Sequence, residues 1–213
     1  MSKKITSRNE YDGLEKRFKT TFFNSIAGVK NACLVATKSA DEKTNLAIFN
    51  SLVHIGANPP LLGLVFRPDS VERHSLENIL STEFFTINLI DQSFIAQAHQ
   101  TSARYTREES EFIETGLQEG HIEAFPVPFV LNAQVSFGMK FREKLEVTSN
   151  GTQILIGEVE WMRYPDEIVA PDGFADLTKL GIVGTLGLDA YLDVKLITRF
   201  SYAKPKLPLQ RKP

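Results

Sequence analysis

An apolar run at residues 61–66, LLGLVF, is followed at once by cationic and hydroxyl side chains. Such a run is typical of a buried strand. After a polar turn that begins at Arg67, the chain reaches Arg73, His74 and Ser75, where the pattern predicts the start of a helix. Arginine can donate two parallel hydrogen bonds to a phosphate, and the first turn of a helix offers free backbone N–H groups to an anion. This stretch therefore has the chemistry of an anion-binding site.

The position of the helix start decides how the stretch is interpreted. Ser75, followed by Leu-Glu-Asn-Ile, fits an N-cap whose hydroxyl accepts a hydrogen bond from the backbone. Asp69 with Glu72 forms a competing capping box that would start the helix earlier. In a purely structural interpretation, the arginines are solvated and Ser75 only caps the helix. The residues alone leave both interpretations open.

The rest of the chain shows no nucleophile with a matching base. The G-x-S-x-G and G-x-x-x-x-G-K-S/T motifs are missing, and three glycines spaced three apart at 181–187 do not match a dinucleotide-binding loop. The four histidines lack metal-ligand spacing, and the single cysteine, Cys33, is expected to fill the core. Three carboxylates are expected on a solvated face: Glu108, Glu109 and Glu111. We therefore predict neither a catalytic side-chain constellation nor a metal site.

Composition narrows the class of protein. The chain has 213 residues, of which 42% are hydrophobic and 23% charged, which is ordinary for a globular protein. Its net charge of -2 argues against a broad nucleic-acid surface. The sequence has neither a secretory signal nor an apolar run long enough to span a bilayer. We expect a cytoplasmic protein with one domain over residues 1–213, a helical extension at 1–27 and a flexible tail at 206–213.

Periodicity predicts the elements of the first half. Helical spacing of Leu14, Phe18, Phe22 and Ile26 predicts an amphipathic helix over residues 11–27. Strands are predicted at 31–37 and 46–51, joined as a hairpin, and again at 61–66 and 83–90, with a helix at 72–81 between the last two. Residues 92–118 are polar and irregular, with short helical turns.

The second half is more clearly β. Apolar residues alternate over 133–147, Asn150-Gly151 predicts a type I′ hairpin turn, and 152–164 returns as the partner strand. A short helix is predicted at 174–180 and a last strand at 195–202. About seven strands with few helices predict a mostly β fold, an antiparallel barrel with peripheral helices packed outside it.

An ordered series of short motifs resembles one family. The series comprises a strand that ends in Thr at 37, the pattern N-L-A-x-x-x-S at 45–51, N-P-P at 58–60, the strand that ends in Arg67, and N-I at 78–79. The later segments SARYTREESEF, GLDAY and SYAKP fit the same series. From about Asn24 to Pro205, the chain resembles the flavin reductase-like, FMN-binding split-barrel family. The resemblance implies an antiparallel split β-barrel of Greek-key type.

The resemblance implies FMN as the cofactor and assigns candidate residues to it. The phosphate contacts would be Arg67, Arg73 and Ser75, with His74 beside them. The ring would lie against the strand that carries Asn45, Ala47, Asn50 and Ser51, and Thr37 and Asn78 are further candidates. Many members carry an arginine on the second-substrate side where this chain has Thr185. That departure leaves the nicotinamide donor open.

The implied activity is that of a flavin reductase. NADH or NADPH would give a hydride to flavin N5, and the electrons would pass to an unknown acceptor, either another flavin, ferric iron, a monooxygenase partner or a small organic molecule. A flavin carries the redox chemistry itself, so the absence of an acid–base pair fits. One alternative is a non-enzymatic FMN protein for electron transfer or flavin storage. Another is a split barrel that holds haem, F420 or a pyridoxal-type ligand.

Two further expectations concern assembly and motion. The resemblance implies a homodimer, and Phe137, Phe141 and Trp161 are large enough to serve both a core and an interface. Residues 92–118 are expected to form a mobile flap over the donor side of the flavin. Four polar residues of that segment could meet a nicotinamide or an acceptor: Gln100, Thr101, Ser102 and Tyr105. A plain connecting loop is the alternative.

Overall fold

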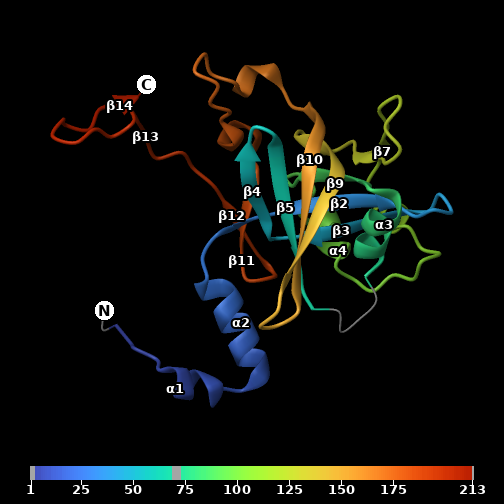
Figure 1. The fold of residues 1–213 in the computed structure, drawn as a ribbon, viewed down its shortest axis with the longest axis horizontal. Helices are drawn as coiled ribbons and strands as arrows, with labels where there is room; N and C mark the ends of the chain where they lie inside the picture. Colours follow the sequence, from blue (N-terminus) through green and yellow to red (C-terminus); the bar gives the residue numbers. More distant parts are fainter. Residues whose placement is uncertain (1–2, 69–72, 213) are drawn as a thin grey trace.

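The computed structural model describes residues 3–68 and 73–212 and has a mostly β architecture (Figure 1). Its centre is a seven-stranded antiparallel sheet in the order β3-β2-β6-β9-β10-β5-β4. The strands of this sheet are β2 Cys33–Lys38, β3 Thr44–Phe49, β4 Leu52–Ala57, β5 Pro60–Phe66, β6 Phe84–Leu89, β9 Ser136–Val147 and β10 Thr152–Arg163. The predicted mostly β fold is confirmed.

The remaining elements surround this sheet. The helices are α1 Arg8–Asp12, α2 Lys16–Ile26, α3 His74–Thr82, α4 Ile95–Gln100 and α5 Glu111–Thr115, with 3-10 turns η1 Asp166–Ile168 and η2 Leu177–Leu180. The short strands are β1 Lys30–Asn31, β7 Glu119–Gly120, β8 Phe129–Val130, β11 Val183–Leu186, β12 Ala190–Asp193, β13 Arg199–Phe200 and β14 Arg211–Lys212. Among the described residues, no helix is long and apolar enough to cross a bilayer.

The two edges of the large sheet are consecutive in the chain. β3 and β4 lie at opposite ends of the strand order, yet only Asn50 and Ser51 separate them. The sheet must therefore curl until its edges approach each other. Ser51 helps to fix this corner, because its Oγ donates a hydrogen bond of 3.0 Å to the carbonyl of Val65 in β5. The curled sheet leaves the outer edge of β3 without a strand partner.

The buried residues form two clusters, one on each face of β2. Val35 belongs to the cluster inside the curled sheet, with Phe85, Met139 and Leu155. Its neighbour Leu34 belongs to the other cluster, which α4 and α5 cover. Because side chains alternate along a strand, burial on both faces requires an unbroken apolar run. Cys33 lies in the inner cluster, where burial raises the pKa of its thiol to about 12, so it fills the core as predicted.

The long hairpin of β9 and β10 is confirmed, but its predicted turn is wrong. Four residues, 148–151, connect the strands. A type I′ turn needs positive φ at both central residues, whereas only Gly151 has one, at 72°. The backbone N–H of Gly151 donates to the carbonyl of Val147 at 2.8 Å. Because this loop has two residues more than a type I′ turn, Asn150 does not need the left-handed conformation.

The ends of the chain differ most from the prediction. The helix expected at 11–27 is divided into α1 and α2, and the apolar side chains of Phe18 and Ile26 are 55% and 64% exposed. The strand expected at 195–202 is reduced to β13, which pairs with β14 near the end of the predicted tail. The predicted helix at 174–180 is reduced to η2. β4, β11 and β12 were not predicted. In Figure 1 both terminal segments extend away from the sheet.

Candidate functional site

A cavity of about 790 Å³ runs along β3 and brings together residues from distant parts of the chain. Its lining includes all but two of the predicted cofactor residues: Asn45, Ala47, Asn50, Ser51, Arg67, Arg73, His74 and Ser75. The two predicted residues outside its lining are Thr37 and Asn78. A cleft of this size is within the usual range for a small-molecule site, roughly 300–1,000 Å³.

The start of α3 forms one end of the cavity. The N-cap position is Arg73, with no side-chain capping bond, so the predicted N-cap role of Ser75 is wrong. Ser75 lies one residue inside the helix, where its Oγ accepts a hydrogen bond of 3.0 Å from Asn45 Nδ2. The competing capping box of Asp69 and Glu72 lies outside the described residues. The backbone N–H groups of the first turn lack intrahelical partners, as at any helix start.

Arg73 and Arg67 add cationic donors at this end. Arg73 Nη2 donates a hydrogen bond of 3.3 Å to the carbonyl of Pro68. Its Nε is buried and has no hydrogen-bond partner among the described residues. Arg67 is exposed, and among the residues that the structure describes it forms no ion pair. A buried donor without an acceptor costs free energy, so this end of the cavity fits an anionic ligand.

The free edge of β3 forms the middle of the cavity wall. Among the residues that the structure describes, β3 pairs with β2 alone, so alternate backbone groups point outward from its other edge. One of these, the N–H of Leu46, donates to Glu111 Oε2 at 2.8 Å. Ile48 lies two residues further on and lines the cavity, so its backbone groups face the same edge. These groups can hydrogen-bond to a planar ligand placed along the strand.

Glu111 was predicted to lie on a solvated face, and this prediction is wrong. Its side chain is 6% exposed and lines the cavity. Burial raises the pKa of its carboxyl group, and the hydrogen bond from the Leu46 N–H opposes that shift. Glu108 is exposed, as predicted. No local signal distinguishes the two glutamates in the sequence, since they are three residues apart in one polar stretch.

Thr37 and Asn78 form a buried pair outside the lining of the large cavity. Asn78 Nδ2 donates to Thr37 Oγ1 at 3.0 Å, and the two residues are 4% and 0% exposed. This bond joins α3 to β2. Asn78 also borders a small adjoining cavity of about 40 Å³. The two residues thus support the helix start that carries Arg73.

Where β3 ends, the wall includes two residues that sequence reasoning did not select, His99 and Tyr191. Asn50 Nδ2 donates to the carbonyl of Gly187, in the turn between β11 and β12, at 2.7 Å. Tyr191 on β12 and His99 on α4 both line the cavity, with 2.9 Å between the tyrosine hydroxyl and Nδ1. The GLDAY segment, noted only as part of the resemblance, contains Tyr191. Thr185 also lines the cavity, is 4% exposed and presents no cation.

The segment expected to be a flap is mostly anchored. α4 and α5 contribute Ala98 and Phe112 to the outer cluster, so much of residues 92–118 belongs to the core. Residues 102–109 are largely exposed, and Ser102 and Tyr105 of this part line the cavity. Tyr105 accepts a hydrogen bond of 3.0 Å from Gln100 Nε2, and Thr101 Oγ1 donates to the carbonyl of Ala98 at 2.8 Å. Only the exposed part remains a candidate flap.

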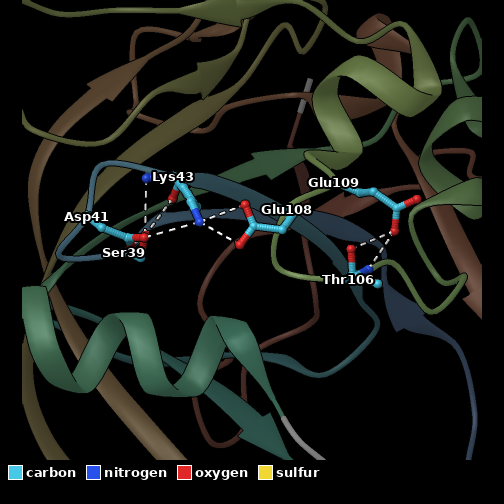
Figure 2. A network of polar contacts seen from close by, with 6 residues as sticks. All are labelled: Ser39, Asp41, Lys43, Thr106, Glu108 and Glu109. Atoms are coloured by element: carbon cyan, nitrogen blue, oxygen red, sulfur yellow. Dashed lines mark hydrogen bonds and ion pairs between the residues drawn. The ribbon is translucent and has the colours of Figure 1, made fainter.

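Surface ion pairs attach this exposed part to the rest of the molecule. Lys43, in the turn between β2 and β3, pairs with Glu108 (Figure 2). Its Nζ lies 2.7 Å and 2.8 Å from the two carboxylate oxygens. The same figure shows Glu109 accepting from the backbone and hydroxyl of Thr106. Arg107 also pairs with Glu77 on α3. The outer wall is therefore held by exposed charges.

Comparison with known proteins relates this chain to flavin reductases. The sequence matches the flavin reductase like domain over residues 29–177. A crystal structure from Shewanella frigidimarina NCIMB 400, assigned as a flavin reductase with a split barrel domain, is 40% identical, with a TM-score of 0.90 over 94% of this chain and 100% of that one. A comparison with curated protein sequences finds no match.

More distant structures share the fold. Nitrilotriacetate monooxygenase component B from Bacillus cereus is 19% identical, with a TM-score of 0.81 over 92% of this chain and 98% of its own. Flavoredoxin of Desulfovibrio vulgaris (Miyazaki F) is also 19% identical, with a TM-score of 0.69 over 97% of this chain and 98% of its own. The protein belongs to the flavin reductase-like family, whose fold is the split barrel. Membership in this family points to an oxidoreductase that uses a flavin.

Proposed function

We propose that this protein binds FMN in the cavity along β3 and acts as an NAD(P)H-dependent oxidoreductase of flavin-reductase type. The observation that carries the proposal is the cationic end of the cavity. There the buried Nε of Arg73 has no partner among the described residues, and the start of α3 lies beside it. Such an end fits the phosphate that distinguishes FMN from riboflavin.

The residues present fit the cofactor at both ends. Arg67, Arg73 and Ser75 would bind the phosphate, with His74 beside them. The ring would lie along β3, against Ala47 and the outward backbone groups near Ile48, and Asn45, Asn50 and Ser51 would border it. When bound, the flavin would supply the two-electron chemistry, accepting a hydride at N5 from NADH or NADPH. The chain's own task is to hold the ring and to admit a second substrate beside residues 99–105.

The related structures do not agree on an acceptor. One is named as a component of nitrilotriacetate monooxygenase, one as 2-nitrobenzoate 2-nitroreductase from Pseudomonas fluorescens, and one as flavoredoxin. All are under 25% identical to this chain, so they support the fold only. A non-enzymatic role in electron transfer or flavin storage is the alternative, and it predicts a bound flavin that NAD(P)H does not reduce.

The test begins with the chromophore and ends with the donor. The purified protein should be yellow, and the extracted chromophore should co-migrate with FMN. Anaerobic mixing with NADH or NADPH should then bleach the flavin absorbance near 450 nm. Bound FMN that neither donor reduces would overturn the reductase proposal and favour the carrier. A colourless protein that does not bind added FMN would overturn the cofactor assignment and favour haem, F420 or a pyridoxal-type ligand.

We also propose a homodimer, on grounds that differ from the sequence prediction. Phe137, Phe141 and Trp161, expected to serve an interface, are half-buried against their own chain. The large exposed apolar side chains instead concentrate on the terminal segments: Phe18, Phe23, Ile26, Val29, Leu196, Ile197, Tyr202, Leu207 and Leu209. Surfaces of this kind mark association sites, and both segments project from the sheet (Figure 1).

Light scattering with FMN bound should give twice the chain mass of 23.9 kDa at micromolar concentration. Deletion of residues 195–213 should lower the dimer fraction, because it removes most of the exposed apolar side chains at that end. A single-chain mass for the intact protein would contradict the dimer. The single domain and the cytoplasmic location remain predictions.

A further inference from the structure

His99 and Tyr191 form a hydrogen-bonded imidazole–phenol pair on the wall of the cavity. The Nδ1 atom of His99 and the hydroxyl of Tyr191 are 2.9 Å apart, and the two rings meet edge to face with centroids 5.8 Å apart. Tyr191 is half-buried against the outer cluster, whereas His99 is exposed. Both residues line the cavity, so a ligand can reach the pair.

The pair lies at the opposite end of the cavity from the cationic α3 end. Asn45 is tied to Ser75 of α3, and Asn50 is tied to Gly187, only a few residues before Tyr191. The five steps between Asn45 and Asn50 span roughly 16 Å of extended chain. This inference rests on the proposed function: if the phosphate of FMN binds beside Arg73, its ring must extend toward His99 and Tyr191.

The pair is suited to deliver a proton. Burial raises the pKa of the Tyr191 phenol, and the negative charge of Asp189 raises it further, so the hydroxyl keeps its proton at neutral pH. If Nδ1 of His99 donates to the phenol oxygen, the Tyr191 proton is free to be given to a ligand. The other ring nitrogen, Nε2, has no hydrogen-bond partner among the described residues and is open to water. A path therefore runs from solvent through both side chains into the cavity.

We propose that Tyr191 donates a hydrogen bond, and then a proton, to the oxygen of an organic two-electron acceptor, with His99 resupplying the proton. The acceptor class is a quinone or conjugated carbonyl compound, because such a molecule must take up a proton together with a hydride. A one-electron acceptor such as ferric iron has no need of this pair. Among the acceptors that the sequence left open, the pair therefore favours a small organic molecule over ferric iron.

The transfer balances at every atom. With the cofactor bound, the acceptor would gain a hydride from its reduced form, and the electron pair displaced onto the acceptor oxygen would take the proton of Tyr191. The phenolate left behind takes the Nδ1 proton of His99 as Nε2 takes a proton from solvent water, so the imidazole stays neutral. Both side chains end in their starting protonation state, with the imidazole in its other tautomer. Positioned proton donors of this kind contribute roughly 10²–10⁴-fold to a rate.

If the pair were purely structural, it would only link α4 to β12. The test therefore needs measurements that the loss of such a link would not change. The first is binding without turnover: oxidised, FMN-loaded protein is titrated with menadione, a quinone it cannot then reduce. Tyr191→Phe should raise the Kd about two- to tenfold through loss of one hydrogen bond. His99→Asn, which keeps a donor near the Nδ1 position, should bind menadione like the wild type. Tyr164→Phe, which changes a phenol that does not line the cavity, is the matched control.

The second measurement compares two oxidants. The bound flavin is reduced photochemically, so the result does not depend on whether NAD(P)H is the donor, and is then reoxidised anaerobically by menadione or by ferricyanide. Tyr191→Phe and His99→Asn should each slow reoxidation by menadione about tenfold or more. Reoxidation by ferricyanide, which takes electrons without a proton, should change by less than about twofold.

The outcomes separate this inference from the proposed function. A wild-type protein that does not bind FMN would overturn both. A protein that binds FMN but whose variants reoxidise equally with both oxidants, whether slowed or unchanged, would overturn only the proton-transfer role. If Tyr191→Phe fails to fold or to bind FMN, His99→Asn still decides: slowing by menadione alone supports the relay, and wild-type rates overturn it.

Discussion

The two long walls of the cavity are held by different kinds of interaction. The inner wall, made by β3 and α3, is joined by a buried hydrogen bond between Asn45 and Ser75, and a second one, between Asn78 and Thr37, ties α3 to β2 behind it. The outer wall at residues 102–109 is held by exposed ion pairs, among them that of Lys43 and Glu108. Buried hydrogen bonds are hardly affected by salt and are costly to break, whereas exposed ion pairs are weak and screened.

The difference assigns different tasks to the walls. A cofactor that stays bound through many turnovers needs a fixed surface, and the inner wall carries the proposed phosphate and ring contacts. A second substrate that enters and leaves at each turnover needs a surface that can open at low cost, and segments with few buried contacts open most readily. Changes to the inner wall should therefore affect folding and FMN binding, and changes to the outer wall should affect only the second substrate.

The largest effect is expected at Glu111, where the inner wall is supported from α5. Glu111→Leu removes the acceptor of the buried Leu46 N–H and should lower the free energy of unfolding by about 1–3 kcal/mol. FMN binding should weaken as well, because the free edge of β3 loses its support. Chemical denaturation and FMN titration measure the two effects. Glu111→Gln keeps an acceptor and is the matched control, and a Leu variant as stable as the Gln variant would contradict the role.

The same residue predicts a dependence on pH. Because burial raises the pKa of Glu111 above its ordinary value of 4.5, the folded protein holds this proton more strongly than the unfolded chain does. The resulting stability is fully present below pH 4.5 and is lost as pH rises through the folded pKa. Glu111→Gln has no carboxyl group to ionise at this position, so its stability does not fall in this way. Its stability relative to the wild type should therefore increase from pH 4.5 toward neutral pH, and a constant difference would contradict the prediction.

The next effect is expected at the cationic end. Arg73→Ala should weaken FMN about tenfold or somewhat more, because a hydrogen bond to a charged group contributes roughly 1.5–3 kcal/mol. Riboflavin binding should be unchanged, since riboflavin has no phosphate. Ser75→Ala should cost less than Arg73→Ala, because the backbone N–H groups remain. Flavin fluorescence titrations with both ligands make the comparison, and equal losses for the two flavins would show damage to the ring site instead of a phosphate contact.

Site residues that lie close together in the sequence could be predicted, and pairs that only packing brings together could not. Arg67, Arg73 and Ser75 follow from a local pattern of strand, turn and helix, which a sequence displays directly. His99 and Tyr191 are 92 residues apart, and Leu46 and Glu111 are 65 apart. Only tertiary packing brings such pairs together, so no spacing rule reveals them.

The errors in the predicted fold have a similar origin. Alternation over residues 133–147 predicted β9, and β10 was predicted as its partner in the hairpin. β4 lies at the sheet edge with Val53 and Ile55 each 43% exposed, and its sequence LVHIGA lacks a clear pattern. α2 has an apolar stripe that the chain itself does not bury. Periodicity therefore predicted a helix there correctly, but not where its apolar face would lie.

A smaller effect is expected for the cavity-facing residues of the outer wall. Ser102→Ala with Tyr105→Ala should raise the KM of the nicotinamide donor several-fold, roughly the loss of one or two hydrogen bonds. FMN affinity and the free energy of unfolding should stay at wild-type values, because neither residue supports the inner wall. Steady-state kinetics with saturating FMN measure the change. An unchanged donor KM and kcat would show that the segment is a plain connecting loop.

The smallest effect, and the one that tests the comparison most directly, is expected at the ion pair of Lys43 and Glu108. Both side chains are exposed, at 42% and 75%, so Glu108→Gln should leave the free energy of unfolding unchanged within error. If the pair restrains the outer wall, its loss should change the donor KM by about twofold or less. Added salt should change the wild-type KM in the same direction and by more than that of Glu108→Gln, because the variant has lost this pair and keeps that of Arg107 and Glu77 to be screened. The inner wall supplies the control, since FMN affinity should be equal in the two proteins at each salt concentration. Identical salt dependence of the donor KM in both would mean that this pair does not hold the outer wall, and the division of tasks between the walls would then rest on the buried bonds alone.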